Sequence, residues 1–332
     1  MALVRHDFSI DATAALPADP LRRGPVEIAA TLVADPALLP ERPPVVLAIP
    51  GGTYHRRYWD LQPPGRSGYS KAEWLARRGV VFVACDYLGG GDSTRPQDGD
   101  FMTLEVAADA AHHVFEQVRG RLEKGELLAA LPPLAGATFV GIGQSLGGFI
   151  TMIQQGKYAD YLGVGIFGSS PKLIANIPRH RRLEGLSREE RRRVIMEDNA
   201  RAAGLSELPV YHFAPRDNFR RIFHTPDVPD DLWDYDLAEC QSPVSRVTGV
   251  DGMTPGLAAP FAKRLEVPVF LAFGEYDVAE DPLAEPTAYR RSPDVSVVVV
   301  PRMAHMHNFA DTRVQLWRRF AQWLTVVTPS PA

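Results

Sequence analysis

A five-residue segment, Gly143-Gln144-Ser145-Leu146-Gly147, constrains the folding of this chain more than any other part of it. An apolar run precedes the segment, and a pattern that favours a helix follows it. Glycines two positions before and after the serine allow the backbone to reverse sharply without a collision between side chains. The Gly-x-Ser-x-Gly pattern between a strand and a helix therefore predicts a serine held above the end of a strand, with strained backbone angles.

Continuous apolar runs alternate with helical patterns along most of the chain, as is typical of parallel strands covered on both faces. Two weaker strand patterns come first, and we expect them to lie antiparallel at one edge of the sheet. These patterns predict an α/β fold with a mostly parallel, twisted sheet of about eight strands and helices on both faces. The strand patterns cover residues 3–10, 26–33, 44–49, 80–85, 137–142, 161–167, 267–273 and 295–300, and the main helical patterns cover residues 70–78, 103–122, 149–155 and 311–326.

The alternation stops between residues 172 and 255, where the chain is polar, helical in places and rich in aromatic residues. Ser187 and Glu190 have the spacing of a capping box, which predicts a helix from there to about Ala203. We expect residues 1–171 and 256–332 to form an α/β core. Residues 172–255 are predicted to form a helical cap or lid, inserted after the sixth strand and without a strand of its own.

Charge and composition exclude several classes of function. The formal net charge of −4 gives no basic balance that would suggest a nucleic-acid partner. No window reaches the roughly 18 apolar residues of a membrane span, and the first residues lack the apolar segment of a signal peptide. Cys85 and Cys240 have no His or Cys at metal-binding spacing, so no metal site is predicted. We therefore expect a cytoplasmic protein that acts on a small molecule, without nucleic-acid or membrane partners; its edge strands would permit a homodimer.

Three side chains that together can activate a hydroxyl group follow predicted strands directly. They are Ser145, Asp277 and His305, in that order along the chain. A serine hydroxyl needs a base within hydrogen-bond reach, and that base needs an acid to orient it. Because active sites of open parallel sheets lie beyond the carboxyl ends of the strands, these three side chains are expected to meet there.

With these features the chain resembles the α/β-hydrolase-fold serine hydrolases, a superfamily of esterase-like and lipase-like enzymes, over nearly its whole length. The resemblance implies that Ser145 is the nucleophile, that His305 is the general base and then the acid, and that Asp277 orients His305. The segments that carry the resemblance are Pro50-Gly51-Gly52, residues 86–93, residues 143–147, Gly274-Glu275-Tyr276-Asp277 and Pro301-Arg302-Met303-Ala304-His305.

The resemblance also implies an oxyanion hole made of two backbone N–H groups. One belongs to Leu146, which follows the nucleophile. Gly52 is expected to provide the other, with Thr53 as the alternative. Many relatives have a histidine at the position of Pro50, so this chain departs from them in the loop that carries the second donor.

Other residues compete for these roles. His307 could be the base in place of His305, and Asp281 could be the acid in place of Asp277. Asp86 and Asp92 are expected to brace their loop rather than to react. The candidates for substrate binding are Thr53, Tyr54, His55, Trp59, Gln144 and His307.

The serine at the sharp turn excludes relatives that use an aspartate there, namely haloalkane dehalogenases and epoxide hydrolases. The predicted function is hydrolysis of an ester, lactone or thioester bond in a small, partly apolar substrate, through an acyl-enzyme and without a metal or organic cofactor. Amide hydrolysis, C–C bond hydrolysis of a diketone, acyl transfer and perhydrolysis are alternatives that use the same three residues. A non-catalytic binding protein on this scaffold would usually have lost one of them.

Overall fold

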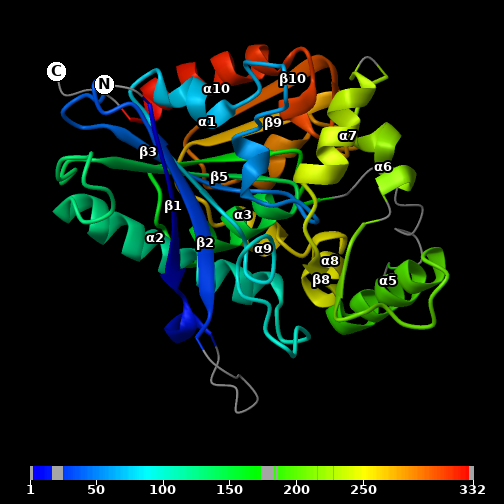
Figure 1. Cartoon of the computed structure of the whole chain (residues 1–332). Helices are drawn as coiled ribbons and strands as arrows, with labels where there is room; N and C mark the ends of the chain where they lie inside the picture. The colour runs from blue at the N-terminus through cyan, green and yellow to red at the C-terminus, as the bar shows by residue number, and fades with distance from the viewer. Residues whose placement is uncertain are drawn as a thin grey trace.

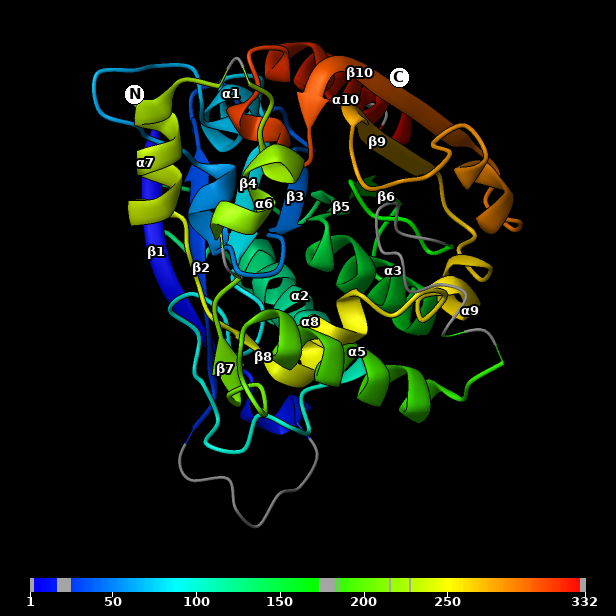
Figure 2. The ribbon, with the colours of Figure 1, turned by 90° about the vertical axis from the view of Figure 1, so that its right-hand side faces the viewer.

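The apolar runs form one eight-stranded sheet in which the strands follow the order β1-β2-β4-β3-β5-β6-β9-β10 (Figures 1 and 2). The computed structural model describes residues 3–16, 25–172, 183, 185–214, 216–226 and 228–328. From β4 to β10 in this order, each strand is parallel to the next, whereas β2 is antiparallel to both β1 and β4. The predicted mostly parallel sheet with antiparallel strands at one edge is therefore confirmed. The strands are β1 (Val4–Asp11), β2 (Glu27–Ala34), β3 (Pro44–Ile49), β4 (Val81–Cys85), β5 (Thr138–Gln144), β6 (Gly163–Phe167), β9 (Val269–Tyr276) and β10 (Val295–Ala304).

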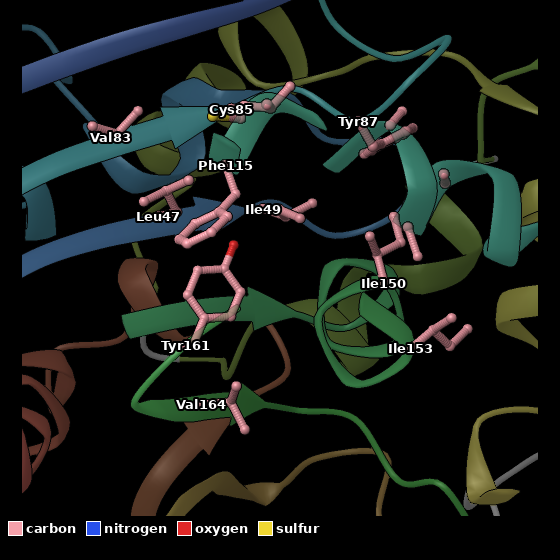
Figure 3. Packing of buried hydrophobic residues seen from close by; sticks show 14 of the residues in the cluster. Leu47, Ile49, Val83, Cys85, Tyr87, Phe115, Ile150, Ile153, Tyr161 and Val164 are labelled. Carbon is pink, nitrogen blue, oxygen red and sulfur yellow. The ribbon is translucent and has the colours of Figure 1, made fainter. Parts of the chain in front are cut away.

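Helices cover both faces of the sheet, because alternate side chains of each central strand point to opposite sides (Figure 1). On β3, Leu47 packs into the cluster under α2, α3 and α9, and Val46 packs into the cluster under α1 and α10. Figure 3 shows the first cluster, where the rings of Phe115 and Tyr161 lie edge to face with centroids 5.1 Å apart. These helices are α1 (Lys71–Ala76), α2 (Leu104–Lys124), α3 (Leu146–Tyr158), α9 (Ala259–Ala262) and α10 (Arg313–Val327). Among the described residues, no helix is long and apolar enough to cross a membrane.

The turn from β5 into α3 has the strained geometry that its sequence predicts. Ser145 lies between the two elements with φ 51° and ψ −117°. A Cβ on Gly143 would lie 2.1 Å from the carbonyl oxygen of Gly147, and a Cβ on Gly147 would lie 2.2 Å from that of Ile49. Both glycines are therefore required by the close approach of β3, β5 and α3.

Between the adjacent parallel strands β6 and β9 the chain leaves the sheet and forms what we call the β6–β9 segment, residues 168–268. Before α9, its helices and strands are α5 (Arg188–Ala202), β7 (Tyr211–His212), α6 (Arg216–Phe223), α7 (Asp230–Glu239), β8 (Val244–Ser245) and α8 (Arg246–Gly252). The capping box at Ser187 and Glu190 begins α5, as predicted. The expectation that this region contains no strand was wrong, because β7 and β8 pair with each other. Strands of two residues are too short to show any alternation in the sequence.

Four short 3-10 helices complete the described elements. They are η1 (Thr13–Ala15), η2 (Arg56–Trp59), η3 (Glu285–Ala288) and η4 (His307–Phe309). η2 lies in the loop after β3, and η4 follows the loop after β10, so both are close to the edge of the sheet where the strands end.

We predict that Gly147→Ala lowers the free energy of unfolding by at least about 2 kcal/mol, because its methyl group has no room against the backbone of Ile49. Gly120→Ala is the matched control. Gly120 lies inside α2, and a Cβ there would meet no atom within 4 Å, so the substitution is expected to raise stability by about 0.5–1 kcal/mol. Urea unfolding of both variants measures the difference; equal midpoints would contradict the close approach.

Candidate active site

Ser145 is placed by the turn between β5 and α3. Its N–H donates to the carbonyl oxygen of Phe167 at the end of β6, with an N–O distance of 2.8 Å. This bond and the positive φ fix the direction of the side chain, which lines a cavity beyond the ends of the strands. The same cavity is lined by His305, as the prediction of a shared site requires.

Asp277 and His305 come together from the ends of β9 and β10. The Oδ1 atom of Asp277 lies 2.6 Å from Nδ1 of His305. The register of β10 shifts between Val300 and Ala304, and Arg302 has φ 53°, so the end of the strand bends before His305. Among the described residues no hydrogen bond joins His305 to the Ser145 hydroxyl; such bonds are often long before substrate binds.

The carboxylate of Asp277 is buried and fully hydrogen-bonded. Its Oδ2 accepts from the N–H of Gly274 at 3.0 Å, and its Oδ1 accepts from the N–H of Val278 at 2.8 Å. Burial acts to raise the pKa of Asp277, but the two histidines beside it, His305 and His307, outweigh burial and hold this pKa well below its usual range. Asp277 is therefore a carboxylate whenever the fold is intact at neutral pH.

The two competing candidates are placed differently. His307 also contacts Asp277, with Nε2 2.6 Å from Oδ2, but it does not line the cavity that holds Ser145. Asp281 accepts hydrogen bonds from the N–H groups of Leu283 and Ala284 and stabilises the turn before η3. The geometry therefore favours His305 as the base and Asp277 as the acid.

The loop after β3 presents one free backbone donor to the cavity. The N–H of Thr53 donates to the hydroxyl of Tyr87 at 3.1 Å and is not available to a ligand. The N–H groups of Gly52 and Leu146 have no partner among the described residues, and a Cβ on Gly52 would lie 3.5 Å from the Leu146 side chain. Of the two candidates for the second oxyanion donor, the geometry favours Gly52.

An arginine of the β6–β9 segment, Arg216 of α6, holds this loop, a contact that was not predicted from the sequence. The carbonyl oxygen of Thr53 accepts from Arg216 Nη2 at 2.8 Å and from the N–H of Ser242 at 2.9 Å. The guanidinium group is buried and lies over the ring of Tyr54, 3.8 Å from its centroid. These contacts brace the loop that follows Pro50. An arginine close to aromatic residues is the only signal in the sequence, and it does not identify a partner so distant along the chain.

α6 is also joined to the loop that carries His305. The N–H of His305 donates to the carbonyl oxygen of Ile222 at 3.0 Å, and the N–H of Met306 donates to that of Phe223 at 2.9 Å. The last turn of α6 therefore contacts the loop after β10, while its first residue contacts the loop after β3.

The cavity has a volume of about 700 Å³ and is mostly apolar. Its walls come from the ends of the strands, from α3 and from the β6–β9 segment. No Asp, Glu, Lys or Arg is among the described residues that line it. The apolar walls include Leu146, Phe149, Leu205, Leu208, Phe213, Phe219, Ile222, Phe223, Val244, Met253, Val278 and Met306, and the polar side chains are Thr53, Ser145, Asn199, Tyr211, His212 and His305.

Of the predicted substrate-binding residues, only Thr53 lines this cavity. Tyr54 is buried and donates its hydroxyl to Asp236 at 2.7 Å. His55 accepts from the N–H of Arg57 at the start of η2. Trp59 is buried in the core and does not line the cavity.

Gln144 and the two loop aspartates have supporting contacts. Gln144 Nε2 donates to the carbonyl oxygen of His305 at 3.0 Å, so it supports the histidine loop from behind. Asp86 accepts from Arg56, through both its backbone N–H and its guanidinium group, and Asp92 contacts the same guanidinium group. Asp86 and Asp92 thus brace their loop, as predicted.

Comparison with known proteins identifies the family. A model described as the alpha/beta hydrolase family matches residues 45–315, so the chain belongs to that family. This assignment supports a general hydrolase. No curated protein matches the chain significantly.

Solved structures with this fold cover nearly the whole chain. An esterase from Thermogutta terrifontis with malate bound is 19% identical and has a TM-score of 0.61, covering 96% of this chain and 99% of its own. A soluble variant of monoglyceride lipase from Saccharomyces cerevisiae with a substrate analogue is 14% identical, with a TM-score of 0.66 and coverage of 92% and 93%. A thioesterase domain from the curacin biosynthetic pathway is 14% identical, with a TM-score of 0.57 and coverage of 97% and 99%. At these identities the likeness concerns the fold.

We predict that Tyr87→Phe lowers the free energy of unfolding by about 1–2 kcal/mol, because the buried N–H of Thr53 loses its acceptor. Tyr235→Phe is the control. The Tyr235 hydroxyl also accepts a backbone N–H, that of Gln62, but at an exposed site where water can replace it. Urea unfolding should therefore show a clear loss for the first variant and little change for the second, and equal losses would argue against a special role of Tyr87.

Proposed function

We propose that the chain hydrolyses carboxylic ester-type bonds of uncharged, largely apolar substrates through an acyl-enzyme on Ser145. The observation that carries the proposal is the shared cavity: Ser145 and His305 line it together, and its described walls contain no Asp, Glu, Lys or Arg. An uncharged acyl chain loses little hydration on entering such a cavity, whereas an unpaired charge would be strongly disfavoured.

The proposed mechanism uses the three residues in their expected roles. His305 takes the hydroxyl proton of Ser145 as the oxygen attacks the substrate carbonyl carbon. The N–H groups of Gly52 and Leu146 donate to the oxyanion of the tetrahedral intermediate. His305 then gives its proton to the leaving group, and a water molecule, activated by the same imidazole, releases the acid from Ser145. Asp277 holds the imidazole with Nε2 toward the serine. None of these steps requires a metal or organic cofactor.

The part of the β6–β9 segment at residues 172–255 is proposed to act as the cap of this site, between the core regions 1–171 and 256–332. It supplies much of the apolar wall, including Leu205 and Phe213, whose side chains are also exposed to solvent. The core supplies the reacting groups. The cap therefore contacts the part of the substrate that extends away from them, and its side chains determine which substrates fit.

The known structures with the same fold include an esterase, a lipase and a thioesterase, and their names are consistent with an ester-type bond. C–C bond hydrolysis and acyl transfer would use the same three residues. A panel of p-nitrophenyl esters, lactones, thioesters and vinylogous diketones, each with and without an added alcohol acceptor, distinguishes these reactions.

We predict that a fluorophosphonate probe labels the folded protein and that Ser145→Ala abolishes the labelling. The same substitution should lower ester hydrolysis by about 10⁴-fold or more, because the nucleophile is lost while the fold is kept. Ser296→Ala, on the edge strand β10, is the control and should label normally. Absence of labelling in the folded wild-type protein would contradict the proposal.

We further predict a preference for uncharged acyl groups. The p-nitrophenyl ester of octanoic acid should be hydrolysed with a kcat/KM at least about 100-fold above that of the mono-p-nitrophenyl ester of octanedioic acid, because the second substrate must bury an unpaired carboxylate. The two acyl chains have the same length, so the comparison isolates the charge. Equal kcat/KM values would show that the acyl group does not occupy the cavity.

A further inference from the structure

The proposed mechanism uses one histidine on Asp277, but the structure has two. Nδ1 of His305 contacts Oδ1 of the carboxylate and Nε2 of His307 contacts Oδ2, each at a nitrogen–oxygen distance of 2.6 Å. With the backbone N–H groups of Gly274 and Val278, each carboxylate oxygen has two neighbours. The second histidine has no part in the mechanism described so far.

His307 cannot act on the substrate directly. Its side chain is 2% exposed and is absent from the walls of the cavity. It begins η4, and this helix is fixed by Asn308, which donates to the carbonyl oxygen of Tyr58 at 3.0 Å and accepts from the indole N–H of Trp317 at 2.9 Å. The imidazole of His307 is thus held against Asp277 by a rigid neighbourhood.

The proton of the His307 ring can be assigned from its contacts. Nδ1 is buried and has no partner among the described residues, whereas Nε2 faces a carboxylate that can only accept. A neutral His307 therefore carries its proton on Nε2 and donates it to Asp277.

Other titratable groups of the described chain approach His307 from neighbouring elements. Tyr58 lies against η4, and its hydroxyl accepts from the N–H of Asn308. The amine of Lys71, from α1, lies 3.7 Å from the centroid of Phe167, the ring that also packs against His307. Burial lowers the pKa of Lys71 well below its usual range, which weakens its charge at this position. Asp277 is thus the group that His307 contacts most directly.

We infer that His307 is a positioning residue that sets the pH range of the proposed hydrolysis by limiting how strongly Asp277 stabilises protonated His305. This inference rests on the proposed function. A hydrogen bond from His307 to Oδ2 draws negative charge away from the carboxylate, so Asp277 attracts the His305 imidazolium less strongly. It also prevents the carboxylate from rotating, so that Oδ1 keeps its hydrogen bond with Nδ1 of His305. If His307 were itself protonated, the effect would have the same direction and greater size.

The sign of the pH effect follows directly. With the donor present, His305 stays neutral, and able to act as a base, down to a lower pH. When the donor is removed, Asp277 stabilises the imidazolium more, so that His305 becomes protonated at a higher pH. The acid limb of the plot of kcat/KM against pH should therefore move to higher pH.

The test uses three variants of the full chain. His307→Phe keeps the ring but removes the donor, and His307→Asn removes the donor from the position of Nε2 while remaining polar. His307→Gln places an amide N–H where Nε2 was. The protonation midpoint of His305 is followed by NMR of ¹⁵N-histidine-labelled protein, with the signal assigned through His305→Gln, and kcat/KM is measured against pH for an ester that the wild type hydrolyses.

We expect the His305 midpoint and the acid limb to rise together by roughly 0.5 to 1 pH unit in the Phe and Asn variants and to return to the wild-type values in the Gln variant. The kcat value should fall while KM stays unchanged, because His307 is outside the cavity. An unchanged midpoint in a folded Phe or Asn variant would overturn the inference. A shifted midpoint in a protein that neither hydrolyses esters nor reacts with the fluorophosphonate would instead refute the proposed function and leave the coupling of the two histidines established.

Discussion

The whole site depends on the absence of any side chain between the end of β3 and the first turn of α3. The Cα of Gly147 is so near the carbonyl oxygen of Ile49 that no methyl group fits between them. This contact forces the backbone of Ser145 into its strained conformation and brings the start of α3 against the loop after β3. Gly52 lies beside Leu146 for the same reason. The nucleophile and both proposed oxyanion donors are therefore positioned by one steric constraint within the core.

Buried charges stand behind the walls of the cavity and not in them. Asp277 is enclosed by two histidines and two backbone N–H groups, and Asp236 accepts from Tyr54 and His224. Arg216 stacks on Tyr54 and donates to a backbone carbonyl group. Such interactions are strong in surroundings of low dielectric constant, and they fix the loops that carry the reacting groups. The walls of the cavity thus contain no Asp, Glu, Lys or Arg, whereas charged side chains behind them hold the loops in place.

The sheet, the sharp turn at Ser145 and the pairing of Asp277 with His305 could be predicted from the sequence, because each is marked by a local pattern at the end of a strand. The contacts that decide the details could not. The N–H of Thr53 is taken by Tyr87, and the carbonyl oxygen of Thr53 is held by Arg216, both of which are distant in the chain. The sequence places His307 among the candidates for substrate binding, but the bend into η4 turns it toward Asp277. Only the folded chain determines such directions, since neighbouring residues in a loop have no fixed periodicity.

The double attachment of α6 has a consequence for protein engineering. Its first residue holds the loop after β3, and its last turn holds the loop that carries His305. Exchange of the whole β6–β9 segment for that of a homologue would replace these contacts with the loops of the proposed active site, as well as the cavity wall that we propose selects substrates. A chimaera that keeps residues 216–223 and grafts only α5, β7, β8 and α8 would separate these two tasks. On the proposed function, the part that could be exchanged to alter substrate specificity is thus smaller than the whole β6–β9 segment.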